Sequence, residues 1–381
     1  MPASMLAPDP LVKQSLARPL RAAEFFAGIG LVKLALEQNG WKVLFSNDID
    51  PDKLEMYAAN FGADHFTLGD IHHLNPADIP SCDLFTASFP CNDLSIAGAG
   101  AGLGGKESSA FWGLIQILKD LGSKRPAIVM LENVVGFLQS RAGKDLETAL
   151  LALNDLGYAV DAFILNASHW APQSRARLFV VAQMSGARGD RTVLATSGDA
   201  RPDALCAFIN ARRNIRWDIR ELPSLPRSDL RLKDIIEDLP DDDSQWWNGR
   251  RAEYFFGQLS EKHLAIARRM IERPAFQYAT AFRRVRKGRS MAELRTDGIA
   301  GCLRTPRGGS GRQILFKAGR GAYRVRLLTA RECARLQGVG DDYVINVGLN
   351  QALFGFGDAV CVPAVGWIAE HYLTPIALSL P

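Results

Sequence analysis

Short apolar segments alternate with amphipathic segments through the first half of the chain. The apolar segments have the length of buried strands, and the segments between them repeat apolar residues at helical spacing. We predict strands at residues 22–26, 41–46, 83–89, 127–131, 159–165 and 178–182. We predict helices at residues 31–38, 51–60, 111–121 and 146–156. Strands that alternate with helices favour an α/β fold with a parallel, doubly wound sheet.

This alternation stops near residue 183 and returns only toward the C-terminus. Proline-rich spacers and scattered helical spacing fill residues 183–322. We therefore predict that residues 1–182 and 323–381 form one α/β domain, which is interrupted by a second, smaller domain at residues 183–322. Further helices are predicted at residues 259–271, 329–337 and 362–371.

Positive charge is concentrated in the predicted second domain. The whole chain carries a formal net charge of +4, yet residues 187–320 hold 27 Lys and Arg against 17 Asp and Glu. A solvated basic face is the plain interpretation of any single basic run. A surplus of this size in one segment favours a surface that binds a polyanion.

Composition excludes several classes of protein. With 47% hydrophobic and 23% charged residues, the chain is neither disordered nor fibrous. Its six cysteines show no CxxC or other metal spacing and are too sparse for a disulfide framework, so we expect a reducing compartment and no metal. The first residues lack the apolar core of a signal peptide, and no stretch reaches the ~18 unbroken apolar residues of a membrane span. We expect a cytoplasmic protein, by default a monomer, that does not contact a membrane.

A glycine loop follows the first predicted strand. It contains Phe26, Gly28, Ile29 and Gly30, and its glycines permit a tight turn and a close approach to a ligand. Lys33 stands where the third glycine of a dinucleotide-binding motif would fall, so a pyrophosphate ligand is less well supported. A plain tight turn remains the alternative.

Acidic residues follow the next segments at a suitable spacing. Asp48 ends the second predicted strand about 20 residues after Gly28, and Ile49 comes next; a carboxylate there suits the hydroxyls of a ribose. Asp70 and Ile71 end the following segment, where they suit an adenine edge. Together with the glycine loop, these residues favour a cofactor that contains adenosine.

One cysteine stands in an unusual context. Pro90 keeps the chain extended just past a predicted strand, so Cys91 should project into a cleft at the carboxyl edge of the sheet. A lone cysteine is more often a small buried hydrophobic residue. Within a glycine-rich stretch at residues 98–105, residues 100–105 match the spacing G-x-G-x-x-G. They do not directly follow a strand, which favours a loop that closes over the site.

Two further polar segments lie beside predicted strands. Glu132 and Asn133 follow the strand at 127–131, where a buried acid needs a partner; capping of backbone N–H groups is the structural alternative. Arg175 and Arg177 precede the strand at 178–182, and strand alternation would place them on the same face.

Taken together, these segments resemble the DNA cytosine-C5 methyltransferase family of the prokaryotic restriction-modification type. The resemblance covers nearly the whole chain, and eight segments follow the family's order. They are Phe26-Ala27-Gly28-Ile29-Gly30, Asn47-Asp48-Ile49-Asp50, Asp70-Ile71, Phe89-Pro90-Cys91, Glu132-Asn133-Val134, Gln173-Ser174-Arg175-Ala176-Arg177, residues 331–338, and Phe356-Gly357-Asp358-Ala359-Val360.

The resemblance implies an S-adenosylmethionine-dependent, Rossmann-like catalytic domain and a target-recognition domain at residues 183–322. It implies S-adenosyl-L-methionine as cofactor, S-adenosyl-L-homocysteine as its product, and double-stranded DNA as partner. The implied cofactor-binding residues are Phe26, Gly28, Ile29, Gly30, Asp48, Ile49, Asp70, Ile71, Pro90, Asp358, Ala359 and Val360.

The resemblance also implies catalytic roles. Cys91 would attack C6 of a cytosine flipped out of the duplex, Glu132 would protonate N3, and Arg177 would hold O2 with Arg175 behind or beside it. The sequence does not identify the group that removes the C5 proton; a water near Asn133 and Cys91 is one candidate. The expected DNA contacts are Ser95, Lys106, Ser108, Arg304, Arg307, Gly308 and Gly309.

Five positions depart from the family's usual residues. Asp358 replaces an Asn and adds a negative charge where the family holds the methionine end of the cofactor. Two alternative functions stay open: an RNA cytosine methyltransferase, although the Cys-Phe-Thr signature of the tRNA-methylating branch is not found, and a catalytically silent DNA-binding relative. A cognate restriction endonuclease would be another gene. The other departures are Glu24 for Asp, Leu31 for Gly, Asn92 for Gln and Ala176 for Glu.

Overall fold

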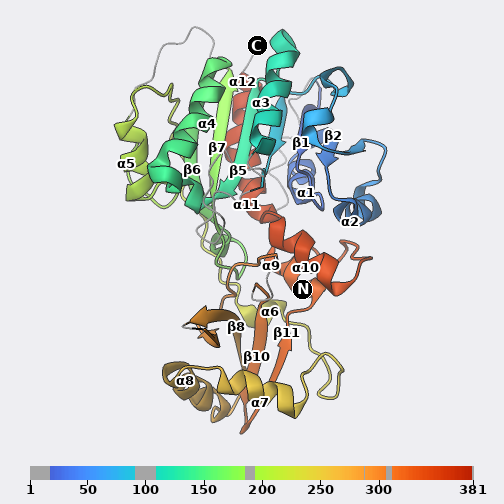
Figure 1. Ribbon diagram of the computed structural model, residues 1–381, viewed down its shortest axis with the longest axis vertical. Helices are drawn as coiled ribbons and strands as arrows, with labels where there is room; N and C mark the ends of the chain where they lie inside the picture. Colours follow the sequence, from blue (N-terminus) through green and yellow to red (C-terminus); the bar gives the residue numbers. More distant parts are fainter. Residues whose placement is uncertain (1–17, 91–108, 185–193, 287, 306–310, 380–381) are drawn as a thin grey trace.

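The structure is a computed structural model that describes residues 18–90, 109–184, 194–286, 288–305 and 311–379. It contains two β-sheets with helices packed against each. In Figure 1 the larger sheet lies in the upper half and the smaller sheet in the lower half, and helices near the C-terminus lie between them.

The described strands of the larger sheet follow the order β3-β2-β1-β4-β5-β7-β6. Strands β1 to β5 run parallel, whereas β7 is antiparallel to both of its neighbours. The predicted doubly wound α/β sheet is therefore confirmed. The bounds are β1 Leu20–Phe25, β2 Trp41–Asp48, β3 Phe66–Leu68, β4 Leu84–Ala87, β5 Ile128–Val134, β6 Tyr158–Asn166 and β7 Ala176–Met184.

Two strands differ from the sequence prediction, and both differences have a physical reason. Only residues 167–175 separate β6 from β7, which is too short for the crossover of a dozen or more residues that parallel strands need, so β7 returns antiparallel. Strand β3 was not predicted because its three residues are partly or fully exposed and carry no apolar alternation.

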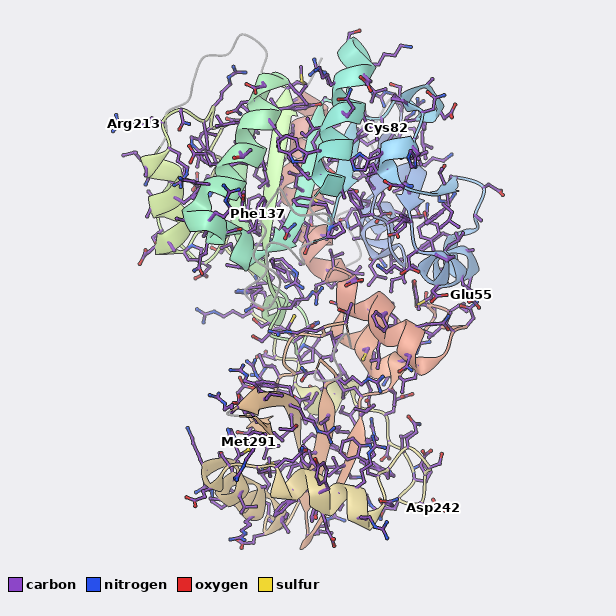
Figure 2. The ribbon with its side chains drawn as sticks, in the orientation of Figure 1. Glu55, Cys82, Phe137, Arg213, Asp242 and Met291 are labelled. Carbon is purple, nitrogen blue, oxygen red and sulfur yellow. The ribbon has the colours of Figure 1, made fainter. Side chains whose placement is uncertain are left out.

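Helices cover both faces of the larger sheet. The first face packs against α1 (Leu31–Gln38), α2 (Pro51–Phe61) and α9 to α12. The second face packs against α3, α4 and α5, and Figure 2 shows side chains filling the space on both faces. The remaining bounds are α3 Ser109–Leu121, α4 Lys144–Asp155, α5 Asp203–Ala211, α9 Ala330–Leu336, α10 Leu349–Asp358, α11 Val362–Ile368 and α12 Thr374–Ser379.

The run Leu349–Ser379 has the length and composition of a membrane-spanning helix. However, 72% of its most apolar window is buried inside the protein. Its apolar side chains belong to the core of the larger sheet. This run is therefore a core element.

The smaller sheet is antiparallel, with the described order β11-β10-β8-β9. Helices α7 and α8 pack against it through a core that includes Phe255, Met270 and Phe316. The sequence analysis foresaw only scattered helices between residues 183 and 322, so these strands were missed. The bounds are α6 Leu232–Ile235, α7 Gly249–Gly257, α8 Glu261–Ile271, β8 Gln277–Arg286, β9 Arg289–Arg295, β10 Ile314–Gly319 and β11 Ala322–Leu327.

Two observations bear on the predicted domain boundaries, which remain a prediction. Strand β11 pairs along β10 as far as Leu327, beyond the predicted boundary at residue 322. Helix α5 lies inside the predicted second domain, yet Leu205, Phe208 and Ile209 belong to the core of the larger sheet. We therefore propose a smaller second domain, whose own core residues lie between Ala252 and Val325.

Candidate functional site

The glycine loop bends sharply between β1 and α1. Phe26, Gly28 and Gly30 have φ values of 58°, 57° and 81°, and the N–H of Ala27 donates to the carbonyl of Asn47 on β2 at 2.9 Å. Positive φ strains a residue with a side chain, so Phe26 is held there by its surroundings. The loop thereby turns its backbone toward the carboxyl edge of the sheet.

Carboxyl groups from the neighbouring segments hold this loop. Asp48 is 6% exposed, and its two carboxylate oxygens accept the N–H groups of Gly28 at 2.8 Å and of Asp50 at 2.9 Å. The oxygens of an ionised carboxylate offer about four acceptor positions, so Asp48 retains capacity for ligand hydroxyls. Asp70 caps the next turn by accepting the N–H of His72 at 3.0 Å.

Next to Asp48 lies an exposed apolar surface. The side chain of Ile49 is 65% exposed, which is unusual for a large aliphatic residue, and Ile71 beyond Asp70 is buried. Glycine turns, a buried acid and an exposed apolar side chain are what an adenosine moiety requires: close backbone approach, partners for ribose hydroxyls and contact with a flat ring. These residues therefore fit the cofactor that the resemblance implies.

The C-terminal segment closes the same site from the other side. Asp358, at the end of α10, accepts a hydrogen bond from Nζ of Lys53 on α2 at 2.9 Å. The hydroxyl of Tyr343 donates to the carbonyl of Ile29 in the glycine loop at 2.6 Å. Asp358 is thus brought to the glycine loop, while Val360 behind it is buried in the core.

Glu132 and Arg177 meet across two antiparallel strands. In the register of β5 and β7, Val134 lies opposite Arg177 and Glu132 opposite Phe179, so the two charged side chains are diagonal neighbours on one face. The Nε atom of Arg177 lies 3.0 Å from Oε1 of Glu132, and the side chains are 16% and 8% exposed. Arg177 neutralises the buried carboxylate.

Asn133 connects this pair to the strand that leads to Cys91. Its Nδ2 donates to the carbonyl of Phe89 at 3.2 Å, and its Oδ1 accepts the N–H of Val134 at 2.8 Å. Phe89 and Glu132 also line one small cavity of ≈ 10 Å³. Pro90 is exposed at the end of the described segment. Cys91 itself lies outside the described residues.

Arg175 occupies a different place from the one expected for a residue that touches the substrate. It is 2% exposed, and its guanidinium donates to the carbonyls of Leu303 at 2.8 Å and of Gly357 at 3.0 Å, as well as to that of Ala359. These hydrogen bonds therefore connect the segment before β7 to the loop at Leu303 and to the end of α10. This arrangement favours a positioning role, behind Arg177.

Cys302 was missed by the sequence analysis. Its Sγ lies 3.4 Å from Nη1 of Arg175 and 4.0 Å from Nη1 and Nη2 of Arg177. Burial raises the pKa of this thiol, but the charges of Arg175, Arg177 and Arg304 outweigh that effect and leave it below its ordinary value. No sequence signal marked Cys302, because Arg175 and Arg177 lie 127 and 125 residues away from it in the chain.

Of the expected DNA contacts, only Arg304 belongs to the described part of the chain, and it is exposed. A Cβ atom added to Gly357 would lie 2.7 Å from the backbone of Arg304 and Thr305, so this loop passes directly over the end of α10. Arg304 is thus brought next to Asp358. The other expected contacts, which lie outside the described residues, are Ser95, Lys106, Ser108, Arg307, Gly308 and Gly309.

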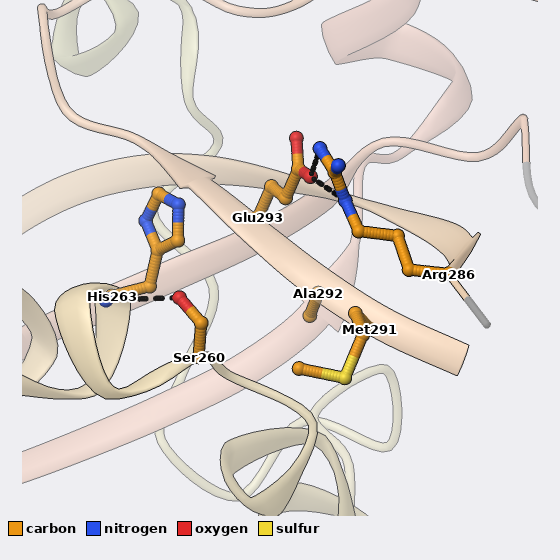
Figure 3. A pocket seen from close by; sticks show the side chains of 6 residues that line it. All are labelled: Ser260, His263, Arg286, Met291, Ala292 and Glu293. Atoms are coloured by element: carbon orange, nitrogen blue, oxygen red, sulfur yellow. Dashed lines mark hydrogen bonds and ion pairs between the residues drawn. The ribbon is translucent and has the colours of Figure 1, made fainter. Parts of the chain in front are cut away.

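A larger cavity, ≈ 240 Å³, lies on the smaller sheet (Figure 3). Ser260, the N-cap of α8, and His263 on that helix face Arg286 and Glu293, which form an ion pair on β8 and β9. This cavity contains none of the residues singled out above. Within the described ranges, no group of three or more His, Cys, Asp or Glu residues is arranged to hold a metal ion.

Basic side chains stack on aromatic rings beside this smaller sheet. The guanidinium groups of Arg251 and Arg283 lie 4.2 and 5.5 Å from the ring centroid of Trp247. The Nζ atom of Lys317 lies 4.8 Å from that of Phe276. The aromatic residues of the basic segment therefore serve partly as supports for its cations, an arrangement that keeps positive charge at fixed positions.

Comparisons with known proteins give one consistent result. The model of the family described as C-5 cytosine-specific DNA methylase matches residues 20–373. The type II methyltransferase M.NgoBI of Neisseria gonorrhoeae is 29% identical over 349 residues, which cover 91% of this chain and 90% of that relative. The type II methyltransferase M.HhaI of Haemophilus parahaemolyticus is 28% identical over 365 residues, which cover 94% of this chain and 96% of that relative.

Among solved structures, the S. pombe Dnmt2 methyltransferase has the same fold. Its crystal structure matches with a TM-score of 0.61 and 20% sequence identity, over 94% of this chain and 99% of that one. At this identity the match describes the fold alone, and it covers both sheets.

Proposed function

This chain belongs to the C-5 cytosine-specific DNA methylase family and is a DNA cytosine-C5 methyltransferase, and on that premise we propose how its residues carry out the reaction. We propose that it methylates a cytosine flipped out of a specific duplex sequence, through a covalent bond between Cys91 and C6 of the base. The observation that carries this proposal is the Glu132–Arg177 ion pair, which Asn133 links to the strand that leads to Cys91.

Cytosine C5 is a weak nucleophile, so the ring must first be activated. The thiolate of Cys91 forms a bond to C6, and the electron pair of the C5–C6 double bond moves through the ring to N3. For this step the carboxylate of Glu132 must first take up a proton from solvent as the base binds; it then gives that proton to N3 and is again the carboxylate paired with Arg177. When bound, S-adenosyl-L-methionine supplies an electrophilic methyl group to C5. Loss of the C5 proton to a base, departure of the Cys91 thiolate and return of the N3 proton to Glu132 then restore the ring, and S-adenosyl-L-homocysteine is the other product.

Arg177 has two roles in this proposal. Its guanidinium holds O2 of the cytosine and stabilises the charge that develops on the ring. Its bond to Glu132 at 3.0 Å fixes the carboxyl group next to the same ring edge. Arg175 keeps Arg177 in place through the backbone carbonyls that it binds.

The cofactor-binding roles are proposed for residues that already lie together. The glycine loop would approach the cofactor with its backbone, Asp48 would accept hydrogen bonds from the ribose hydroxyls, and Ile49 would cover the adenine. Ala359 and Val360 would line the site next to Asp358. Each of these roles suits the turn, the burial or the exposure reported above.

We propose that the substrate is double-stranded DNA. We also propose that methylation protects this DNA within a restriction-modification system, as the type II names of the relatives suggest. Unstacking the base costs a few kcal/mol, which phosphate contacts must offset. The basic side chains of the second domain and the exposed Arg304 are suited to such contacts. We accordingly expect the protein to act inside the cell, where this DNA lies.

The covalent step has a direct test. DNA that contains 5-fluorocytosine cannot lose its C5 substituent, so wild-type protein with S-adenosyl-L-methionine should form an adduct that survives denaturing electrophoresis. The Cys91→Ala variant should form no adduct and transfer no methyl group while still binding DNA, and Cys206→Ala, a buried cysteine on α5, serves as the matched control. An adduct with Cys91→Ala, or none with wild type, would contradict the mechanism. Bisulfite sequencing of DNA from expressing cells would give the target sequence, and methylation of tRNA alone would reassign the substrate.

A further inference from the structure

Glu24 is a carboxyl group buried just before the glycine loop. It is the last residue but one of β1, and the loop begins two residues later at Phe26. Glu24 is 2% exposed, and its Oε2 has no hydrogen-bond partner among the described residues. Burying a charged oxygen without a partner costs far more than burying a neutral one, because the charge loses its hydration. The proposed methyl transfer does not use this group.

The strands on either side present hydroxyl groups to Glu24. In the register of the larger sheet, Glu24 lies beside Ser46 on β2 and Thr86 on β4. The Oγ atom of Ser46 is bound to the hydroxyl of Tyr57 at 2.7 Å. Thr86 is 1% exposed, and in the described part of the chain its Oγ1 also lacks a partner. A neutral carboxyl can both donate and accept hydrogen bonds, and buried surroundings of this kind favour that form.

Charged groups of both signs face Glu24 from α1 and β2. Burial raises the pKa of Glu24 to about 8, and the charges of Asp48 and Glu37 act in the same direction. The charge and the backbone N–H of Lys33 lower this pKa but do not outweigh burial. The Nζ atom of Lys33 is already bound to Glu37 at 2.5 Å. Lys33 is therefore shared between two acids.

Two tyrosines face the same carboxyl group. Burial raises the pKa of Tyr57 on α2 and of Tyr343, and the charge of Glu24 adds to the effect on both. Both hydroxyls therefore stay uncharged in neutral and mildly alkaline solution. Tyr343 also donates to the carbonyl of Ile29 in the glycine loop at 2.6 Å. A charge on Glu24 thus acts on a residue that holds the loop.

The position of Glu24 couples it to the glycine loop and to Asp48. Glu24 precedes the loop on β1, and Lys33, whose backbone N–H acts on it, follows the loop on α1. Asp48 holds the same loop through the N–H of Gly28 at 2.8 Å. A ligand seated on the loop would exclude water from both acids, and water is what weakens the repulsion between two negative charges. Ionised Glu24 is therefore less favourable beside a bound ligand than in the free protein.

We propose that Glu24 is a positioning residue for the glycine loop that acts in its uncharged form, so that affinity for the cofactor falls when Glu24 ionises. This inference rests on the proposed function and goes beyond it, because it couples the adenosine site to the binding of a proton. Linkage requires the reciprocal effect: a bound cofactor makes Glu24 hold its proton more tightly. Binding in mildly alkaline solution must then be accompanied by proton uptake.

Titration calorimetry on the full chain can test this without catalysis. The probes are S-adenosyl-L-homocysteine and 5′-methylthioadenosine, which carries no group that titrates in neutral or mildly alkaline solution. Glu24→Gln keeps the shape of the neutral carboxyl and cannot ionise. We expect the ratio of the wild-type Kd to the Glu24→Gln Kd to rise about 3- to 10-fold between about pH 6.5 and 9 for both probes. In buffers of different ionisation enthalpy, wild-type protein should take up protons with 5′-methylthioadenosine near about pH 8.5, and Glu24→Gln should take up none.

A control variant and a second readout keep the outcomes distinct. Glu55→Gln removes an exposed carboxyl group on α2 (Figure 2) and should follow wild type at every pH. The same pH dependence in wild type and Glu24→Gln would overturn the inference. If wild-type protein bound neither probe at any pH, the proposed cofactor itself would be wrong. Should Glu24→Gln fail to fold, proton uptake by wild type with 5′-methylthioadenosine decides, and its absence would refute the coupling.

Discussion

Arg177 and Glu132 face each other from neighbouring antiparallel strands, with Nε and Oε1 3.0 Å apart and both side chains largely buried. This pair joins the group proposed to hold the base to the group proposed to protonate it. A change in one of them must therefore alter the environment of the other.

Glu132→Gln keeps the shape of the side chain but removes the proton that the mechanism needs. We expect the rate of methyl transfer to duplex DNA to fall roughly 100-fold or more, as is typical when a general acid is lost. The rate should be measured in single-turnover assays with labelled cofactor, and binding of S-adenosyl-L-homocysteine should stay near the wild-type value. A near wild-type rate would show that Glu132 has only a structural role.

Gly30 and Gly28 make a matched pair in the glycine loop. At Gly30, with φ of 81°, an added Cβ would lie 2.5 Å from Cε2 of Phe61, whereas at Gly28, with φ of 57°, its nearest neighbour would be 3.9 Å away. We expect Gly30→Ala to lower the free energy of unfolding by about 2–5 kcal/mol, from backbone strain and overpacking together, and Gly28→Ala by about 1–2 kcal/mol from strain alone. Urea unfolding measures both, and equal costs would contradict this account.

Glu24 should make stability depend on pH. The side chain on β1 is 2% exposed, its Oε2 has no hydrogen-bond partner among the described residues, and burial raises the pKa of this carboxyl to about 8. Because the folded-state value lies above the unfolded one, the stability it contributes is present below about pH 4.5 and is lost as the pH rises toward 8.

The variant Glu24→Gln cannot ionise and should remove this dependence. We expect the difference in unfolding free energy between the variant and wild type to increase in favour of the variant, by up to about 1.4 kcal/mol for each pH unit between about pH 5 and 8. Urea unfolding of both proteins at several pH values provides the measurement. A constant difference across that range would mean that Glu24 keeps an ordinary pKa.

Cys302 should be the most reactive of the described cysteines. Arginine charges lower its pKa, whereas burial raises the pKa of Cys82 and of Cys361 to about 12. In a Cys91→Ala background, iodoacetamide at about pH 8 should label Cys302 first, because the thiolate is the nucleophile. Peptide mass spectrometry would identify the site. Labelling of Cys82 at the same rate would contradict this expectation.

The Arg326–Glu332 pair should support the junction between β11 and α9. Both side chains are fully buried, and Nη1 of Arg326 lies 2.7 Å from Oε2 of Glu332. We expect Glu332→Gln to cost about 3–5 kcal/mol of unfolding free energy, because a buried guanidinium then lacks its counter-charge. The control is Glu293→Gln, in the exposed pair with Arg286, where we expect less than about 1 kcal/mol. Similar costs for the two variants would exclude this explanation.

Local sequence patterns were sufficient to predict the larger sheet and the residues at its carboxyl edge. The glycine loop follows β1 directly, and Asp48 and Glu132 lie in the last residues of β2 and β5, so the strand that carries a residue also fixes its place. The smaller sheet was missed because its strand signals are weak. In β8 only three consecutive residues of a ten-residue strand are buried, and the exposed end carries Arg284 and Arg286.

Contacts between distant segments could not be foreseen. The sequence indicated that Asp358 adds a charge near the cofactor, but nothing near Asp358 pointed to Lys53 as its partner. Cys302 and Arg175 likewise meet across 127 residues. Arg175 matched a motif without revealing that its guanidinium binds backbone carbonyls. In each case the partner is set by how the chain returns to the sheet, which no local pattern encodes.

The return of the last helices to the glycine loop has a consequence for biosynthesis. Tyr343 binds the carbonyl of Ile29, and Asp358 binds Lys53, so contacts beside the glycine loop join segments that lie 314 and 305 residues apart. A nascent polypeptide lacks these contacts until its final quarter has left the ribosome. A chain that stops before Tyr343 therefore cannot form either contact, and we expect it not to bind the proposed cofactor.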